Sequence, residues 1–285
     1  MGCYLCGAAD FEPREGKVRD KPELSILECR GCGLVFLADQ SDRDTSFYAE
    51  SGMHGASSLD VQSWLRETDK DDQRRFELLA DKLVGRRVLD FGCGVGGFLL
   101  KAKERAASVH GVEPEKRLAA HFLQHGVTVW PDCEGVDPAN RFEIITAFHV
   151  LEHLPDPRDA LRKLGGLLAD ASSEIIVEVP SSSDALLMLY RNRAFSEFTY
   201  WSCHLYLFDA ANLALLARQA GLRVNFVRQI QRYPLSNHLH WLSRGKPGGH
   251  QVWSFLDTPD LARSYEAALA ANGLCDTLIA SFSHA

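Results

Sequence analysis

The sequence predicts an α/β protein in which a doubly wound parallel sheet follows a small metal-binding unit. Three observations predict it. Apolar strand-like runs alternate with helical segments between residues 86 and 229. A glycine-rich loop, VLDFGCGVGGFLL, follows the first of these strands, and two Cys-x2-Cys pairs precede the whole series.

Composition limits the classes of function. The chain has 285 residues, 46% of them hydrophobic, enough for one large core with small additions. The formal net charge of −7 disfavours nucleic acid as a partner. Because we find no apolar run long enough for a membrane span and no secretory layout, we expect a cytoplasmic protein without a membrane partner.

The first cysteines have the spacing of a metal site. Cys3, Cys6, Cys29 and Cys32 form two Cys-x2-Cys knuckles, each followed by glycine. Four thiolates in this arrangement select zinc and leave no open position, so we expect a structural zinc. Disulfides are the alternative, but without an export signal zinc is favoured. We predict a zinc-ribbon domain over residues 1–40, whose unfolding on zinc removal leaves the rest folded.

Residues 41–75 are predicted to form a linker and a cap helix. The segment up to residue 68 is polar, and the apolar spacing of Phe76, Leu79 and Leu83 indicates a helix that starts at Asp69 and ends at Gly85. The main domain then covers residues 76–285.

The sheet of the main domain is predicted from strand and helix signals in turn. The expected strands are 86–91, 108–114, 127–130, 142–148, 173–180 and 222–229, with helices at 98–106, 116–126 and 161–169. Residues 276–283 alternate as a strand and are assigned as a seventh, antiparallel strand. Residues 231–275 are then a partly helical insertion before the last strand.

The glycine loop points to a particular cofactor. Gly92, Gly94 and Gly97 satisfy GxGxxG, but Asp90 precedes them at the end of the strand. A carboxylate here would repel the pyrophosphate of a dinucleotide, whereas it attracts the amino group and sulfonium of S-adenosylmethionine. Glu113, at the end of the second strand, suits two ribose hydroxyls with either cofactor.

Three ordered motifs resemble one family. VLDFGCGVGGFL, GVEP and FEIITAFHVLEHLPDP are similar to the motifs of class I S-adenosylmethionine-dependent methyltransferases, over roughly residues 75 to 230. The resemblance implies a Rossmann-like seven-stranded methyltransferase sheet. It also implies that Asp90, Gly92 and Gly94 contact the cofactor, that Glu113 holds the ribose, that Asp132 lies near the adenine, and that His149 lies beside the cofactor.

A base is wanted if the acceptor is a hydroxyl or an acidic carbon. The segment YWSCHLYLFD resembles the stretch that carries a histidine in many of these enzymes, which makes His204 the first catalytic candidate. In sugar C-methyltransferases, which share the four-cysteine domain, an acidic residue precedes that histidine. Cys203 replaces it here, so Tyr206 is a second candidate, and His149 and His153 are also candidates.

HVLEH permits a metal-assisted alternative. His149, Glu152 and His153 share one face of a helical turn and, with His204, would bind a divalent ion. The stretch resembles the Glu-x-x-Glu-His metal motif of small-RNA-end and quinone-pathway O-methyltransferases, except that His149 replaces the first glutamate.

The insertion is interpreted as a substrate cap. It offers polar and aromatic groups suited to an anionic, hydroxyl-rich acceptor: Arg232, Asn237, His238, Lys246 and Trp253. It also resembles segments of methyltransferases in sugar and cell-surface polysaccharide pathways. The leading expectation is therefore a methyltransferase that acts on a nucleotide sugar or glycan precursor.

Three other functions are weighed against it. An RNA methyltransferase that grips nucleic acid with the ribbon conflicts with the acidic charge. A metal-assisted O-methyltransferase of a small metabolite follows from HVLEH, and a non-enzymatic cofactor-binding protein conflicts with the intact glycine loop. The ribbon and the cap are plausible contacts of a homodimer.

Overall fold

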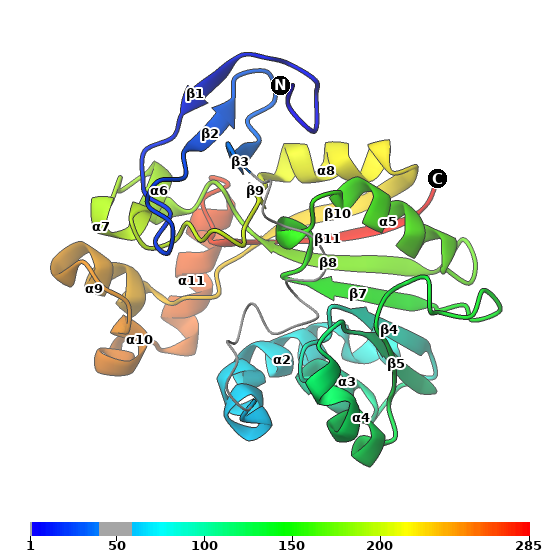
Figure 1. Cartoon of the computed structure of the whole chain (residues 1–285). Coiled ribbons are helices and arrows are strands. Elements are labelled where there is room, and N and C mark those ends of the chain that lie inside the picture. The colour runs from blue at the N-terminus through cyan, green and yellow to red at the C-terminus, as the bar shows by residue number, and fades with distance from the viewer. Residues whose placement is uncertain (1, 40–58) are drawn as a thin grey trace.

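The computed structural model describes residues 2–39 and 59–285 and contains one large mixed sheet (Figure 1). Its order is β10-β11-β8-β7-β4-β5-β6. The strands are β4 (Arg87–Phe91), β5 (Ser108–Val112), β6 (Thr128–Trp130), β7 (Ile144–Phe148), β8 (Glu174–Pro180), β10 (Leu222–Ile230) and β11 (Thr277–His284). The core strands pair in parallel, and β11 is antiparallel to both neighbours. The predicted fold class is confirmed, including the antiparallel last strand.

Helices cover both faces of this sheet (Figure 1). One face carries α2 (Val61–Leu83), α3 (Gly97–Ala102) and α4 (Ala119–His125), and the other carries α5 (Pro157–Gly166) and α8 (Ala210–Gln219). A hydrophobic core lies on each face of the sheet, and successive residues of a strand point into opposite cores. Ile144 packs with α2 and α3, and Ile145 packs with α5 and α8. Burial on both faces explains why these strands read as continuous apolar runs.

The long helix α2 begins earlier than the sequence predicted. Its first residue is Val61, and the Asp60 side chain accepts a hydrogen bond from the Ser63 N–H at 2.9 Å. The prediction of a start at Asp69 was wrong because an apolar stripe with Trp64 and Leu65 continues through a polar background. Residues 41–58 of the expected linker lie outside the described residues.

The N-terminal unit is a small sheet that incorporates a strand of the main domain. Strands β1 (Phe11–Pro13), β2 (Ile26–Cys29) and β3 (Val35–Leu37) are joined by β9 (Tyr206–Leu207) in the order β1-β2-β3-β9. Phe36 of β3 pairs with Tyr206 of β9. Cys3, Leu5 and Leu34 belong to the same core as α5 and α8. This shared core argues against the expectation that the ribbon unfolds alone.

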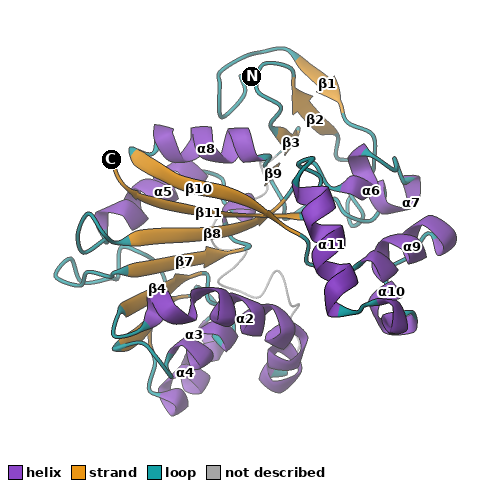
Figure 2. Cartoon of the chain, turned by 180° about the vertical axis from the view of Figure 1, so that it is seen from behind, coloured by secondary structure: helices purple, strands orange, loops and turns teal. Residues whose placement is uncertain are grey.

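A helical cap lies beyond one end of the large sheet (Figure 2). It contains α6 (Ala185–Met188), α7 (Arg193–Ser196), α9 (Leu235–Arg244), α10 (Gly249–Val252) and α11 (Pro259–Ala270). The sequence predicted the insertion at 231–275 but not α6 and α7. Short 3₁₀ turns add η1 (Lys116–Leu118), η2 (Leu151–His153) and η3 (Ser254–Leu256). In the part of the chain that is described, no helix is both long and apolar enough to cross a membrane.

Candidate active site

A large cavity lies at the carboxyl ends of β4, β5 and β7. Its volume is about 1160 Å³. Ligands bind at this edge in doubly wound sheets because strand ends and helix starts meet there. All six predicted cofactor residues line the cavity: Asp90, Gly92, Gly94, Glu113, Asp132 and His149.

The glycine loop has a shape that side chains would disrupt. Gly92 has a φ of 72°, and a Cβ built on it would lie 2.5 Å from Cγ2 of Val150. Gly94 has a φ of 53° and donates its N–H to a Glu113 carboxylate oxygen at 2.8 Å. Glycine is therefore required at Gly92 both for its backbone conformation and for space.

Asp90 lies buried under the loop. Its carboxylate accepts a hydrogen bond from the Thr146 hydroxyl at 2.7 Å. Burial raises the pKa of Asp90 to about 7, despite the hydrogen bond from Thr146 and the charge of Arg75, which lower it. A cationic ligand next to Asp90 would favour its ionised form, as the sequence argument for a sulfonium cofactor requires.

Glu113 and Asp132 mark the next two strand ends. Glu113 accepts the N–H groups of Gly94 and Glu115, the second at 3.0 Å, and burial raises its pKa. Asp132 accepts the Gly135 N–H at 2.8 Å. Asp132 therefore forms the polar turn that the sequence allowed and also lines the cavity.

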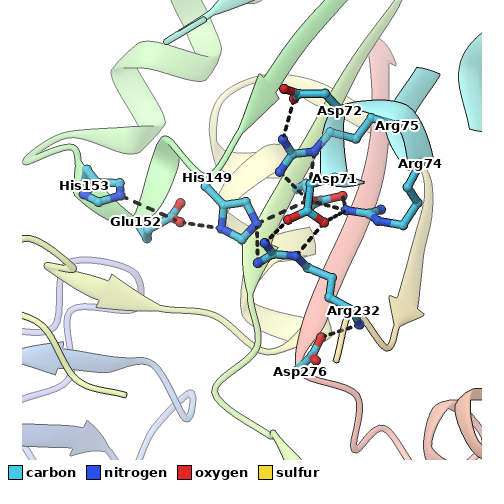
Figure 3. Close-up of polar contacts among 10 residues, drawn as sticks. Asp71, Asp72, Arg74, Arg75, His149, Glu152, His153, Arg232 and Asp276 are labelled. Atoms are coloured by element: carbon cyan, nitrogen blue, oxygen red, sulfur yellow. Dashed lines mark hydrogen bonds and ion pairs between the residues drawn. The ribbon is translucent and has the colours of Figure 1, made fainter. Parts of the chain in front are cut away.

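His149 adopts a strained conformation at the end of β7. Its φ is 56°, in the left-handed region that residues with a side chain rarely occupy. Nδ1 lies 3.2 Å from Glu152 (Figure 3), and Nε2 lies 3.2 Å from Glu178. The His149 N–H also donates to the Glu178 carbonyl at 2.7 Å. Two buried carboxylates therefore hold both ring nitrogens of His149.

Arg232 connects this histidine to α2 and β11. It forms an ion pair with Asp71, and its Nη1 lies 3.1 Å from Nε2 of His149 (Figure 3). Its backbone N–H donates to Asp276 at 3.0 Å. Burial alone would raise the pKa of Asp71, but the hydrogen bond and charge of Arg232 hold it well below its usual range.

Arg75 and Arg74 of α2 neutralise Glu178. Arg75 Nη2 lies 2.7 Å and Arg74 Nη2 lies 2.9 Å from the Glu178 carboxylate, which is 0% exposed. Burial opposes ionisation of Glu178, but the hydrogen bond from His149 and the charge of Arg75 hold its pKa well below the ordinary value. We call this set the ionic cluster: Asp71, Arg74, Arg75, His149, Glu152, Glu178 and Arg232.

Most residues of the ionic cluster were not predicted from the sequence. A signal was present in EIIVEVP, where Glu178 interrupts the buried apolar run that follows Glu174, because a buried charge needs a partner. DDQRR on α2 offered those partners. Nothing in the sequence places these two segments together, since Arg75 and Glu178 lie 103 residues apart.

The four catalytic candidates do not share one surface. His149 and His153 line the cavity, whereas His204 and Tyr206 are not among its lining residues. The His204 ring packs on His153 with centroids 4.7 Å apart, and burial lowers the pKa of His204 to about 3. The Tyr206 hydroxyl donates to the Pro155 carbonyl at 3.2 Å. His204 and Tyr206 therefore lie behind the cavity wall.

Among the predicted substrate residues, Arg232 alone lines the large cavity. His238 is buried, with Nδ1 2.7 Å from the Tyr265 hydroxyl. The buried Asn237 accepts the Gly248 N–H at 3.3 Å, and Lys246 is exposed. Asn237 and His238 hold the cap together, and neither they, Lys246 nor Trp253 reaches this cavity.

The four N-terminal cysteines converge as predicted. The Sγ atoms of Cys3 and Cys32 are 3.6 Å apart, and those of Cys6 and Cys29 are 3.5 Å apart. All four lie within 4.8 Å of one another. The edge of a zinc tetrahedron with bonds of about 2.3 Å is roughly 3.8 Å, so the cluster fits the ion.

Comparison with known proteins identifies the family. A methyltransferase-domain model matches residues 64–225, which include the glycine loop, Glu113 and β7. The chain belongs to the methyltransferase-domain family. It is a class I S-adenosylmethionine-dependent methyltransferase with S-adenosylmethionine as its cofactor, and the match includes neither the ribbon nor residues 226–285 of this methyltransferase.

Curated relatives extend the match. The methyltransferase is 32% identical over 173 residues to a ubiquinone biosynthesis O-methyltransferase of Bordetella avium, covering 55% of this chain and 70% of that one. It is 27% identical over 180 residues to the enzyme of the same name from Aeromonas salmonicida, covering 57% and 75%.

A solved structure supports the fold alone. It belongs to the complex between the Haloferax volcanii Trm112 methyltransferase activator and a methyltransferase. The TM-score is 0.50 at 14% identity, over 79% of this chain and 97% of that chain.

Proposed function

We propose that this enzyme transfers the methyl group of S-adenosylmethionine to a hydroxyl oxygen of a small metabolite. The observation that carries this proposal is one continuous cavity, which reaches from Glu113 and the glycine loop to His153 and Arg232. Cofactor and acceptor would therefore meet beside His149 and Val150. A shared meeting point of this kind suits in-line transfer between two small molecules.

The size and lining of the cavity support a small acceptor. Its volume of about 1160 Å³ exceeds the roughly 300–1,000 Å³ that is usual for one small-molecule site. Beyond the glycine loop, Trp64, Val150, Leu154 and Tyr233 contribute apolar surface. This surface favours a flat, partly apolar acceptor over a hydroxyl-rich sugar.

The relatives favour the same reading. The names of the Bordetella avium and Aeromonas salmonicida enzymes describe O-methyltransferases of ubiquinone biosynthesis and mention no sugar or glycan. Four of the five residues predicted to recognise a sugar also lie away from the cavity. The small-metabolite alternative from the sequence is therefore our proposal in place of the nucleotide-sugar expectation.

The proton of the acceptor hydroxyl would be removed at the part of the cavity that His149 and His153 line. S-adenosylmethionine supplies the methyl group and the sulfonium leaving group, so the protein must position the acceptor oxygen and remove its proton. His153 is better placed for this than His149, because both ring nitrogens of His149 contact buried carboxylates. Asp90, Gly92, Gly94, Glu113 and Asp132 would hold the cofactor.

The four-cysteine cluster would bind a structural zinc. Its ligands come from the two knuckles around β2, and the spacing of their sulfurs suits a closed tetrahedral site. This zinc would stabilise the sheet that β9 shares with the ribbon.

Incubation with methyl-labelled S-adenosylmethionine tests the proposal. The acceptors are a panel of phenols and catechols, a panel of nucleotide sugars, and bulk tRNA, with products identified by mass spectrometry. We expect a labelled methyl ether on a ring hydroxyl and stoichiometric S-adenosylhomocysteine. His153→Asn should lose turnover while it retains cofactor affinity, and Lys246→Ala is the matched surface control. Label confined to sugars or tRNA would refute the proposal.

A further inference from the structure

We infer that His153, Cys203 and His204 form a second zinc site behind the acceptor end of the cavity. One donor atom from each residue lies within 4.8 Å of the other two. Nitrogen and sulfur ligands of a tetrahedral zinc stand roughly 3.3–3.6 Å apart. Small side-chain movements would therefore bring the three donors to bonding positions.

Backbone contacts hold the two segments that supply these donors. His153 ends η2, and its neighbour Glu152 accepts the Leu205 N–H through its carbonyl at 2.7 Å. On the other side, the ribbon residue Asp20 accepts the Ser202 N–H at 2.9 Å. The approach of Cys203 and His204 to His153 is thus fixed by one main-chain hydrogen bond and by one hydrogen bond to the Asp20 carboxylate.

The donor chemistry selects zinc rather than magnesium. Two imidazoles and one thiolate are ligands for zinc and other soft or borderline ions, whereas magnesium prefers oxygen. Cys203 is 2% exposed, and His153 lines the cavity. Three protein ligands leave a fourth position, which is the arrangement of catalytic zinc sites.

The ligand set differs from the one that HVLEH predicted. Glu152 lies 3.2 Å from His149 and 4.0 Å from His153, and His149 in turn contacts Glu178. Among the described residues, the donor atoms of His149, Glu152, His153 and His204 do not come together as one group. Cys203, the residue that replaces the expected acid, is the third ligand in place of His149 and Glu152.

The chemical role of this site rests on the proposed function. Of the three ligands only His153 lines the cavity, so an acceptor hydroxyl would have to reach the fourth position from the His153 side. Bound there, it would lose its proton to water more readily, because the cation lowers the pKa of a bound oxygen acid. The oxygen would then attack the methyl carbon, and the electrons of the C–S bond would leave with the sulfur. In this arrangement His153 would act as a ligand, and water would replace it as the acceptor of the proton.

Zinc stoichiometry tests the site without any assay of turnover. The wild-type chain is dialysed to equilibrium against buffered zinc, and bound metal is counted by mass spectrometry. We expect two zinc ions per chain in the wild type and one in Cys203→Ser or His204→Ala. The matched control is Cys275→Ser, because Cys275 is also fully buried but belongs to no donor group of the described residues. It should retain two.

Cobalt substitution gives a second readout. Cobalt–thiolate charge-transfer absorption should fall by about one fifth in Cys203→Ser, because one of five thiolate ligands is lost. Equal zinc counts in all four proteins, or an unchanged cobalt spectrum, would overturn the site. Methyl ether formation with one zinc per chain would leave the proposed function standing without this site. Two zinc ions without any ether product would support the site and refute the function.

Discussion

The two sides of the active-site cavity are built in different ways. On the proposed cofactor side, Asp90, Gly92, Gly94 and Glu113 come from two consecutive strand ends within 24 residues. On the other side, the ionic cluster combines α2, the ends of β7 and β8, and the segment after β10 (Figure 3). The cofactor side depends on local backbone shape, whereas the ionic cluster depends on long-range charge pairing. Substitutions should therefore damage the two sides differently.

Loss of the ribbon zinc tests whether the stability of the main domain also depends on this N-terminal unit. Cys6→Ser, at an exposed position, should remove the ribbon zinc without disturbing packing. Because the ribbon shares its core with α5 and α8, we expect one cooperative unfolding transition, lowered by about 10 °C or more. Differential scanning calorimetry with Cys275→Ser as the control checks this. An unchanged main transition with early loss of the N-terminus would show that the ribbon folds independently.

Arg232→Ala should cause the largest loss within the ionic cluster. It removes one of the two arginines that contact Asp71 and the only one that contacts His149 among the contacts described, while Arg74 still contacts Asp71 and Arg74 and Arg75 still contact Glu178. We therefore expect a cost of about 1.5–3 kcal/mol in the free energy of unfolding. The low pKa of Asp71 contributes stability above about pH 4, so the difference from wild type should narrow as the pH falls below that value. Urea titrations from pH 3 to 8 measure it, and Arg232→Lys should lose less. A loss that does not change with pH would contradict the ionic explanation.

Asp90→Asn should have different effects on the stability of the protein and on its affinity for the cofactor. The raised pKa of Asp90, about 7, means that the folded protein binds more protons than the unfolded chain between about pH 4 and 7. Without cofactor, the free energy of unfolding of the wild type should therefore fall as the pH rises from about 4 to 7, by as much as about 4 kcal/mol. The free energy of unfolding of the variant should fall less over the same range. Cofactor affinity, from calorimetric titration, should drop in the variant and should rise with pH through 7 in the wild type. A pH-independent wild-type affinity would argue against a charge role for Asp90.

Gly92→Ala should act through shape alone. The added Cβ would contact Val150 and would sit at positive φ, so we expect cofactor affinity to fall by about 30- to 100-fold, equivalent to about 2–3 kcal/mol. Gly221→Ala is the matched control, because its φ is 81° with no atom within 4 Å of the added Cβ. It should lose about 1 kcal/mol of stability or less and no affinity. Equal losses of affinity would disprove a local effect.

Lys246→Ala should have the smallest effect. Lys246 is exposed and does not line the cavity, so the KM for the acceptor should stay within about twofold of the wild-type value. The free energy of unfolding should stay within about 0.5 kcal/mol of wild type. Steady-state kinetics with the ring-hydroxyl acceptor measure it. A large rise in KM would restore the view of the insertion as a substrate cap.

Much of the architecture could be predicted because its determinants are local. Continuous apolar runs predicted the parallel strands, and the order of Asp90, the loop glycines and Glu113 predicted the edge of the sheet where the large cavity lies. The start of α2 was missed because its apolar stripe is thin and its N-cap lies in a polar stretch. Asn237 and His238 do not line the large cavity, and the sequence could not show this, because a polar residue that bonds within its own cap is the same residue type as one that faces a ligand.

The sequence by itself determined the fold class, the four-cysteine cluster and the cofactor loop, since each depends on residues a few positions apart or on a fixed spacing. Tertiary structure alone decided that Arg75 and Arg232 meet Glu178 and His149, and that Cys203 meets His153 across 50 residues of chain. The physical reason is that buried charges and metal ligands need partners in space, and only the packing of strands and helices determines which distant residues those partners are.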